Sequence, residues 1–593
     1  MREQFRGYRV LMGFGLRAAP WHATFQLITG VLMELAAPAA AYGAKMLVDA
    51  AVRHSLHSGL IAVAVLAGSA ALGMIALIVY IDCVFTVYDR AGAYADIRLM
   101  ELIGGAPGLA HHERPEYLDQ VERIRTDRGM LSGMVNATAG VLRVLAVVGA
   151  SATLLASVNP ILLVLPIFGV VSLMAGRRAT TLWNNANEAT SEPERLRRHL
   201  FEIATASESG KELRVFGTSK ELLRRHHEVS GTVLNTRNRA DWRGALLNSA
   251  DGLLSGLGFV GAIALVLRQA VHGQATAGDV VLAISLAGTL NGIVFTAVAY
   301  GTQGLRGLKL AGRFLWLERY ATAQVGDEVS AVPPNRLRTG ITFRDVSFRY
   351  PGTDRPVLDG ASLELPAGGV VALVGENGAG KTSLVKLLSR FYEPDSGRIE
   401  IDGVDLQGFP IDAWRGRISA TYQDHTAFEF LARETVGIGD LARIDDELAV
   451  RRALDAGGGT EVVRGLPHGL DTQLGKSWED GVDLSGGQWQ KLALGRGLMR
   501  DDPLLVVFDE PTSALDPQTE HDLFERFAAA ARGSGNRGTV TLLVSHRFST
   551  VRMADLIVVL DGGRIAEHGS HAELMRAGGM YAELYELQSR AYR

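Results

Sequence analysis

The sequence predicts an N-terminal transmembrane domain of six spanning helices, followed by a C-terminal α/β P-loop domain. Three observations predict this fold class. Six long apolar runs, nearly free of charged residues, lie before residue 320, and short β-rich segments alternate with helical stretches after about residue 340. A glycine-rich loop that ends in Lys-Thr follows one of these β-rich segments, and such loops bind phosphate in that context.

The composition of the 593-residue chain excludes several classes of protein. The formal net charge is −4, so no overall positive field marks a nucleic-acid binder, and we expect no nucleic-acid partner. Cys83 is the single cysteine, which excludes an intramolecular disulfide framework and a zinc site built from several cysteines. The hydrophobic fraction of 47% is ordinary because it averages an apolar part and a charged part.

The apolar runs have, or nearly have, the length that a helix needs to cross a hydrocarbon core about 30 Å thick. Buried helices of a large soluble protein would explain one such run but not six. We therefore expect a multi-pass protein in the lipid bilayer. The runs are residues 25–44, 59–81, 135–158, 161–176, 246–267 and 280–304.

Basic residues predict the orientation of these spans. Arginines and lysines are frequent before the first span, between spans two and three, and between spans four and five, whereas the opposite loops are short and poor in them. By the positive-inside rule both termini are cytoplasmic and the protein lies in the cytoplasmic membrane. The two long cytoplasmic connections contain helical patterns, so the spanning helices are expected to project well beyond the bilayer.

Three charged residues, Glu34, Arg143 and Asp251, interrupt the apolar runs. Charges inside a membrane are costly and are often functional. They either line a polar cavity that contacts substrate or form a structural ion pair, and the sequence leaves both readings open.

The change from long apolar runs to alternating β-rich and helical segments gives the expected domain bounds. Residues 1–320 form the transmembrane domain, residues 321–339 a linker that contains Pro333 and Pro334, and residues 340–593 the soluble domain. An alternation of β-rich and helical segments argues for a largely parallel sheet. The clearest expected strands are residues 370–374, 398–401, 504–508, 541–544 and 556–560.

The strongest local motif follows the strand at 370–374 and matches G-x-x-x-x-G-K-[ST]. Its backbone N–H groups close around phosphate oxygens, Lys381 places a charge on the β- and γ-phosphates, and Thr382 coordinates Mg²⁺. The helix that follows points its positive end at the anion. The predicted ATP-binding loop consists of Gly375, Glu376, Asn377, Gly378, Ala379, Gly380, Lys381, Thr382 and Ser383.

A second strand, residues 504–508, ends in Asp509 and Glu510. An unbroken apolar run suits a buried parallel strand that delivers a carboxylate to the Mg²⁺ shell. Glu510 stands next along the chain, where it polarises an attacking water or is a simple surface carboxylate.

Between these motifs stands Leu-Ser-Gly-Gly-Gln at residues 484–488, and with it the chain resembles the ATP-binding cassette (ABC) transporter family. The six preceding spans with their long cytoplasmic extensions look like the exporter-type membrane domain, so the resemblance covers nearly the whole chain. It implies a half-transporter that needs a second half, with a homodimer favoured and a heterodimer as the alternative. In the family, the signature residues hold a nucleotide bound by the other subunit; here they are Ser485, Gly486, Gly487 and Gln488.

The resemblance also assigns single residues. Tyr350 stacks on adenine, Gln423 touches Mg²⁺, and Asp516 belongs to the loop that communicates across the dimer. Asp509 is then the metal ligand and Glu510 the catalytic base, while His546 senses the γ-phosphate and Lys381 assists catalysis.

Two cytoplasmic turns, residues 113–120 and 210–217, occupy the places where the family's membrane domain docks on the cassettes. Residues 472–483 depart from the family's usual short motif before the signature, which leaves their register open. The family's activity implies ATP-driven export of a small molecule, drug, lipid or peptide. The alternatives are a lipid flippase, a siderophore-type importer and, in a different class, a regulatory channel; an intact Glu510 and signature argue against the last.

Overall fold

The computed structural model describes residues 2–206, 209–324, 331–510, 538–545 and 547–591. The chain forms two compact units. The first contains residues 1–104 and 120–319, and the second contains residues 105–119 and 320–593. Each unit is described by itself.

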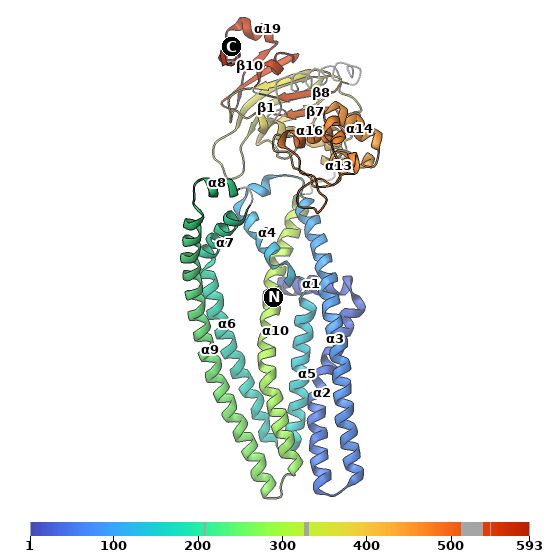
Figure 1. Ribbon diagram of the computed structural model, residues 1–593, viewed down its shortest axis with the longest axis vertical. Helices are drawn as coiled ribbons and strands as arrows, with labels where there is room; N and C mark the ends of the chain where they lie inside the picture. The colour runs from blue at the N-terminus through green and yellow to red at the C-terminus, as the bar shows by residue number, and fades with distance from the viewer. Residues whose placement is uncertain (1, 207–208, 325–330, 511–537, 546, 592–593) are drawn as a thin grey trace. The chain divides into compact units, whose positions relative to one another are not determined.

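The first unit is a set of long helices, drawn in blue to yellow-green in Figure 1. Its three longest helices have 49, 53 and 48 residues and therefore extend over about 70–80 Å, more than twice a hydrocarbon core. The expected projection of these helices beyond the bilayer agrees with that length. The elements are α1 (Arg2–Ala18), α2 (Pro20–Val52), α3 (Leu56–Gly104), α4 (Pro115–Asp127), α5 (Met134–Val158), α6 (Leu165–Ala189), α7 (Ser191–Thr205), α8 (Gly210–Val215), α9 (Ser219–Val271) and α10 (Ala277–Gln324), with short 3₁₀ turns η2 (Arg128–Met130) and η3 (Pro160–Val164).

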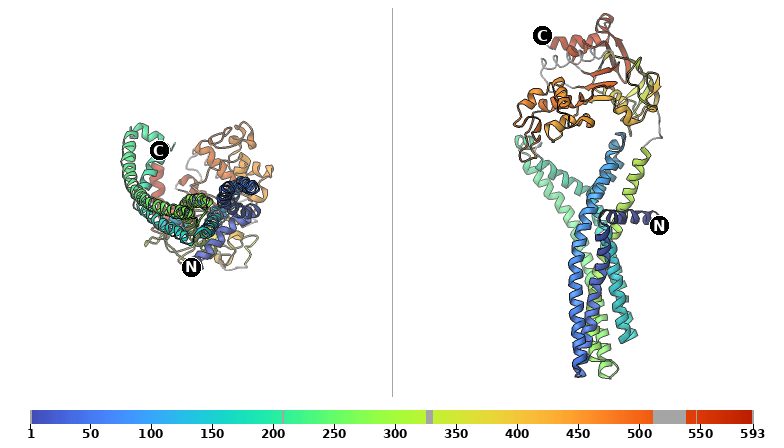
Figure 2. Two further views of the ribbon diagram at one scale, coloured as in Figure 1. Left: turned by 90° about the horizontal axis from the view of Figure 1, so that it is seen from below. Right: turned by 90° about the vertical axis from the view of Figure 1, so that its right-hand side faces the viewer.

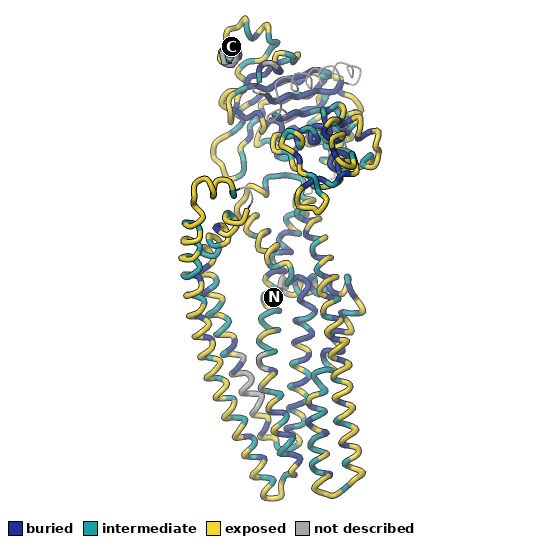
Figure 3. Tube along the Cα trace, in the orientation of Figure 1, coloured by how far each residue is buried: buried dark blue, intermediate teal, exposed yellow. Residues whose placement is uncertain are grey.

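The six apolar runs lie in α2, α3, α5, η3 with α6, α9 and α10. Within the described residues, α2, α3, α5 and α9 are each long and apolar enough to cross a membrane, and α10 contributes the shorter apolar stretch Ala277–Leu290. Much of their surface is exposed in the single chain, as the yellow stretches of Figure 3 show. Exposed Leu, Ile and Val side chains on a helix suit contact with lipid tails or a second subunit.

Glu34 and Arg143 contact each other inside the bundle. The Arg143 guanidinium donates to the Glu34 carboxylate, through Nε at 3.1 Å and through Nη2, and it donates to the hydroxyls of Tyr80 and Tyr300 at 3.1 Å each. Gly140 leaves the space for the Tyr300 ring, since a Cβ at that position would lie 2.1 Å from it. The ion-pair reading is therefore the one that the structure supports, and the pair ties α2, α3, α5 and α10 together.

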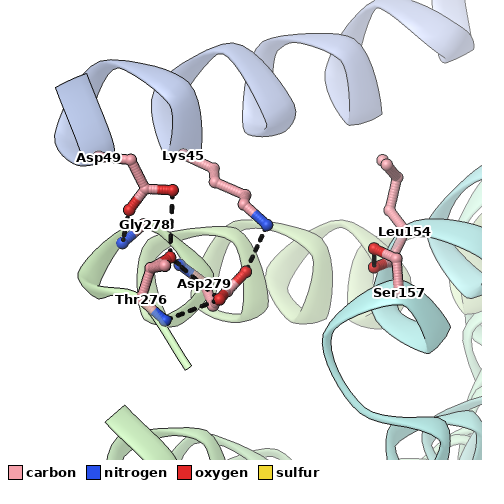
Figure 4. A network of polar contacts seen from close by, with 7 residues as sticks. All are labelled: Lys45, Asp49, Leu154, Ser157, Thr276, Gly278 and Asp279. Atoms are coloured by element: carbon pink, nitrogen blue, oxygen red, sulfur yellow. Dashed lines mark hydrogen bonds and ion pairs between the residues drawn. The ribbon is translucent and has the colours of Figure 1, made fainter. Parts of the chain in front are cut away.

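A second polar cluster joins the end of α2 to the start of α10, as Figure 4 shows. Lys45 Nζ lies 2.5 Å from Asp279 Oδ1, and the Asp49 carboxylate accepts from the Thr276 hydroxyl at 3.1 Å and from the Gly278 N–H at 2.9 Å. Asp279 in turn accepts from the N–H of Thr276 at 2.8 Å, in the manner of a helix cap.

The second unit contains two sheets in the described residues. A six-stranded sheet has the order β10-β9-β3-β8-β7-β6, parallel except for β10, and a four-stranded antiparallel sheet has the order β2-β1-β4-β5. The largely parallel sheet is thus confirmed, and the five expected strands lie within two residues of their predicted ends. The strands are β1 (Gly340–Phe348), β2 (Leu358–Pro366), β3 (Val370–Val374), β4 (Ser396–Ile401), β5 (Val404–Asp405), β6 (Ile418–Thr421), β7 (Leu505–Asp509), β8 (Val540–Val544), β9 (Leu556–Asp561) and β10 (Arg564–Gly569).

Helices surround these sheets, whose strands are largely buried (dark blue in Figure 3). Trp414 is fully buried, and its indole N–H donates to the Leu388 carbonyl at 2.7 Å, which fixes α11 to α12. A second core, around Leu454 and Leu492, holds α13 to α16 together. The helices are α11 (Lys381–Leu388), α12 (Ile411–Arg415), α13 (Ala432–Gly437), α14 (Glu447–Ala456), α15 (Thr460–Arg464), α16 (Gly486–Gly497), α18 (Phe548–Val551), α19 (His571–Ala577) and α20 (Met580–Ala591), with 3₁₀ turns η1 (Ala110–Glu113), η4 (Leu406–Gly408), η5 (Leu441–Arg443) and η6 (Gly469–Asp471).

Residues 105–119 belong to the second unit, although in the chain they follow directly on α3 and include the first residues of α4. The Leu109 N–H donates to the Phe391 carbonyl at 3.1 Å, and Leu109 and Ala110 pack on the core of the sheets. The Tyr392 hydroxyl donates to the Glu113 carboxylate at 2.5 Å. The expected docking of residues 113–120 on the cassette is therefore confirmed at Glu113, whereas docking of residues 210–217 on a partner stays a prediction.

Candidate functional site

The phosphate loop connects β3, whose five residues are all buried, to α11. Three of its glycines, Gly375, Gly378 and Gly380, have φ values of 147°, 84° and 105°, in the region that side chains disfavour. A Cβ on Gly375 would lie 2.2 Å from the Leu560 carbonyl oxygen. The loop therefore holds its closed shape because glycine stands at these positions.

Lys381 is the first residue of α11 and is only 6% exposed. Its Nζ donates to the carbonyls of Gly375 at 2.8 Å and Glu376 at 2.9 Å. Burial lowers the pKa of the ammonium group, and the nearby carboxylates of Glu510 and Asp509 oppose that shift. The ammonium group is thus held within the loop by hydrogen bonds to two carbonyls, and phosphate oxygens can take the place of these carbonyls as acceptors.

Asp509 ends β7 and is 2% exposed. Burial, followed by repulsion from Glu510, raises the pKa of this carboxyl to about 6, and a hydrogen bond from the Thr382 side chain acts in the opposite direction. Its Oδ1 has no hydrogen-bond partner among the described residues. A buried, unsatisfied carboxylate oxygen beside a hydroxyl matches the oxygen ligands that Mg²⁺ prefers, so Asp509 and Thr382 fit the expected metal.

Glu510 follows directly and has a φ of 46°, a left-handed conformation that is strained for a residue with a side chain. Its N–H donates to the Val544 carbonyl at 3.0 Å, which holds that conformation. Gln423, just after β6, donates from Nε2 to Glu510 Oε2 at 3.0 Å. The predicted base is therefore oriented by Gln423, while the contact of Gln423 with Mg²⁺ stays a prediction.

The signature residues form the start of α16. The Ser485 hydroxyl accepts from the Gln488 N–H at 3.3 Å, and the Gln488 side chain accepts from the Ser485 N–H at 2.8 Å. This reciprocal capping leaves Ser485 and Gly486 exposed at a helix N-terminus. An exposed, positively polarised helix end suits the second nucleotide cradle that the sequence predicts.

Tyr350, which follows β1, lies against α11. Its hydroxyl is 2.9 Å from Ser383 Oγ, and the Lys386 ammonium lies 5.0 Å from the centre of its ring. Tyr392 meets the same ring edge-on at 5.3 Å. Sequence reasoning missed Tyr392, although its position just beyond the phosphate-loop helix is a signal that could have found it.

Residues 472–483, whose register the sequence leaves open, form a closed loop. The Gly475 N–H donates to the Val482 carbonyl at 3.0 Å and the Val482 N–H donates to the Gln473 carbonyl at 2.9 Å. Glu479 and Asp480 lie exposed near the tip of this loop, next to Trp478, which is 54% exposed.

The structure thus brings Lys381, Thr382, Gln423, Asp509 and Glu510 together at the carboxyl ends of β3, β6 and β7. The remaining loop residues that we expect to bind ATP, Glu376, Asn377 and Ala379, lie beside them in the same turn. Two expected residues, Asp516 and His546, fall outside the described residues.

Comparisons with known proteins agree with this site. The family model described as "ABC transporter" matches residues 358–513. An "ATP-dependent lipid A-core flippase" of Aromatoleum aromaticum is 40% identical over 329 residues, which is 56% of this chain and 53% of that protein. The chain thus spans about half the length of that relative.

A protein of the same name from Cupriavidus pinatubonensis is 33% identical over 432 residues, which is 72% of this chain and 69% of the relative. Among solved structures, a bacterial Atm1-family ABC exporter with ATP bound superimposes with a TM-score of 0.76 and 26% identity, over 97% of this chain and 98% of that one. The chain therefore belongs to the ATP-binding cassette transporter family, as an exporter-type half-transporter with a fused membrane domain and nucleotide-binding domain.

Proposed function

We propose that this protein hydrolyses ATP to drive export across the cytoplasmic membrane as one half of a dimer. The observation that carries the proposal is the convergence of Lys381, Asp509 and Glu510 at one edge of the parallel sheet, with Gln423 bonded to Glu510. Such a group positions and neutralises the phosphates and orients a water, which is most of what phosphoryl transfer requires.

Each residue has a distinct task in this mechanism. The loop N–H groups and Lys381 hold the β- and γ-phosphates, and Tyr350 stacks on adenine. Thr382 and Asp509 hold Mg²⁺, which neutralises charge on the phosphate oxygens when bound. Glu510 accepts the proton of the attacking water, and the hydrogen bond from Gln423 keeps its carboxylate in position.

The second nucleotide contact comes from the other half. The capped start of α16 presents Ser485 and Gly486 to solvent, so it is free to contact a nucleotide held by a partner. A homodimer is favoured because this chain carries both a full signature and Glu510, so two copies give two complete sites. A heterodimer is the alternative, and the mass of the purified assembly distinguishes the two.

The cargo that we propose is a membrane lipid with a polar headgroup. The support is that two relatives which match this chain over several hundred residues are named lipid A-core flippases. This choice narrows the wider expectation of a small molecule, drug, lipid or peptide. Both termini are proposed to be cytoplasmic, because the basic loops lie on that side.

The test is transport in reconstituted vesicles that contain a fluorescent short-chain lipid, with Glu510→Gln as the matched control. ATP should change how much label a membrane-impermeant quencher can reach, and Glu510→Gln should bind ATP but turn over at least about 100-fold more slowly. Parental ATPase activity in Glu510→Gln would refute the assignment of the base. Transport of a drug or peptide without transport of the lipid would refute the proposed cargo. Net ATP-driven transport of substrate toward the cytoplasmic face would refute export and favour the siderophore-type importer.

A further inference from the structure

Helix α1 lies crosswise to the long helices of its own unit in both side views (Figures 1 and 2). The chain turns at Ala19, whose φ and ψ are −147° and 66°, and Pro20 opens α2. Because α2 is long and apolar enough to span the bilayer, a helix that crosses it runs along the membrane surface.

One face of α1 packs into the bundle. Leu11 and Phe14 are 1% and 5% exposed, and the Phe14 ring contacts the rings of Tyr94 at 5.4 Å and Phe314 at 5.2 Å. Gly7 permits this close approach, since a Cβ there would lie 2.9 Å from the Ala311 methyl group. The helix is therefore held in a fixed rotation about its axis.

That rotation presents a basic face. Arg6, Arg9 and Arg17 fall on one side of a helix with 3.6 residues per turn, and all three are exposed. No ion pair of these arginines occurs within the part of the chain that the structure describes. Arg98 on α3 differs, because it pairs with Glu101 at 2.8 Å and Glu318 at 3.5 Å.

The three arginines line a hollow of about 830 Å³ between α1, α3 and α10. Its walls also include Arg98 with its carboxylate partners Glu101 and Glu318, which leaves the arginines in excess over the carboxylates. The apolar side chains of Phe5, Val10 and Ile97 complete the walls, and of these Phe5 is 64% and Ile97 is 58% exposed. The hollow therefore offers cationic hydrogen-bond donors next to an apolar surface.

We propose that this hollow is a binding site for the headgroup of an anionic phospholipid of the surrounding bilayer. The lipid phosphate contacts Arg6, Arg9 and Arg17, whose guanidinium groups suit phosphate geometry, and the upper acyl chain lies along Phe5 and Ile97. A free phosphate would use the arginines but would leave the apolar wall uncovered. The site lies outside the nucleotide-binding unit and does not depend on which cargo is moved.

The test measures lipid retention by the full-length protein without nucleotide. The protein is purified from phosphatidylcholine nanodiscs with and without added phosphatidylglycerol, and bound lipid is counted by native mass spectrometry. The variant is R6Q/R9Q/R17Q; the matched control is R452Q/R552Q/R576Q, which removes the same charge from exposed positions of the other unit.

We expect R6Q/R9Q/R17Q to lose phosphatidylglycerol retention by about 100-fold, because each arginine near a membrane surface contributes about a fivefold gain in affinity. The control should retain it as the parent does, and R6K/R9K/R17K should restore much of it, which shows that charge rather than folding is responsible. Equal retention by R6Q/R9Q/R17Q and parent would overturn the site. Displacement of the lipid by soluble glycerol 3-phosphate at low excess would overturn the lipid as its occupant.

Discussion

The substitution Asp509→Asn should make the nucleotide-free protein more stable and lower the affinity of the metal site for Mg²⁺. Asp509 is 2% exposed at the end of β7, and its Oδ1 has no hydrogen-bond partner among the described residues. Its ionised form is therefore poorly solvated until a cation arrives. Asparagine has nearly the same shape and removes that charge.

The magnitude follows from the pKa of this carboxyl, which rises from an ordinary 3.8 to about 6 in the folded protein. One pKa unit corresponds to about 1.4 kcal/mol, so ionised Asp509 costs about 3 kcal/mol. A raised pKa means that the folded state binds the proton more tightly than the unfolded state. The cost is therefore absent near pH 4, grows as the pH rises toward 6, and is complete above about pH 7.

The assay is hydrogen exchange of the peptides that contain β7 and β8, with EDTA and without nucleotide. A local measurement is needed because a chain of two units does not unfold in one step. Asp509→Asn should stabilise these strands against exchange by about 3 kcal/mol at pH 8 and by only about half as much at pH 5, while its affinity for Mg²⁺ with ATP falls. An equal effect at both pH values, or none at pH 8, would refute the reasoning.

Three further substitutions test other contacts. Tyr392→Phe keeps the ring but removes the hydrogen bond to Glu113. The free energy of local opening of residues 105–119, measured by hydrogen exchange, should fall by about 1 kcal/mol while the affinity for ATP is unchanged. An unchanged exchange rate would count against the contact. Ser485→Ala removes the N-cap of α16 and should lower the stability of the first turn of this helix by about 1 kcal/mol. Ser485→Asp should not lower it, because aspartate is also a good N-cap residue. Arg143→Leu leaves the partly buried Glu34 carboxylate without its ion-pair partner and should lower stability in lipid by about 3–5 kcal/mol. Most of this loss should be recovered when Glu34 is also replaced by Gln, and no recovery would argue against the pair.

The parts of the fold that sequence predicts are those encoded locally. The phosphate loop needs glycines within a few residues of one another, and an apolar strand such as Val370–Val374 is buried on both faces, so both are readable from a short window. The antiparallel sheet is harder to predict, because β1 is irregular: its register shifts around Asp345, whose φ is 52°.

Contacts between distant segments are not readable in this way. Glu113 and Tyr392 are 279 positions apart, and neither residue belongs to a sequence motif that predicts a contact with the other. The charges of Glu34 and Arg143 are visible in the sequence, but only the packing of the helices decides that they face each other rather than a cavity. The rotation of α1 likewise depends on how Phe14 meets Tyr94 and Phe314.

The membership of residues 105–119 in the second unit has a consequence for how the protein is made. A ribosome completes this segment more than two hundred residues before it completes β1, so the segment waits for its binding surface during synthesis. A cassette cut free at residue 340 lacks it and exposes the Phe391 carbonyl and the apolar surface that Leu109 and Ala110 cover. Such a fragment is incompletely folded and prone to aggregate through this apolar surface until residues 105–119 are supplied.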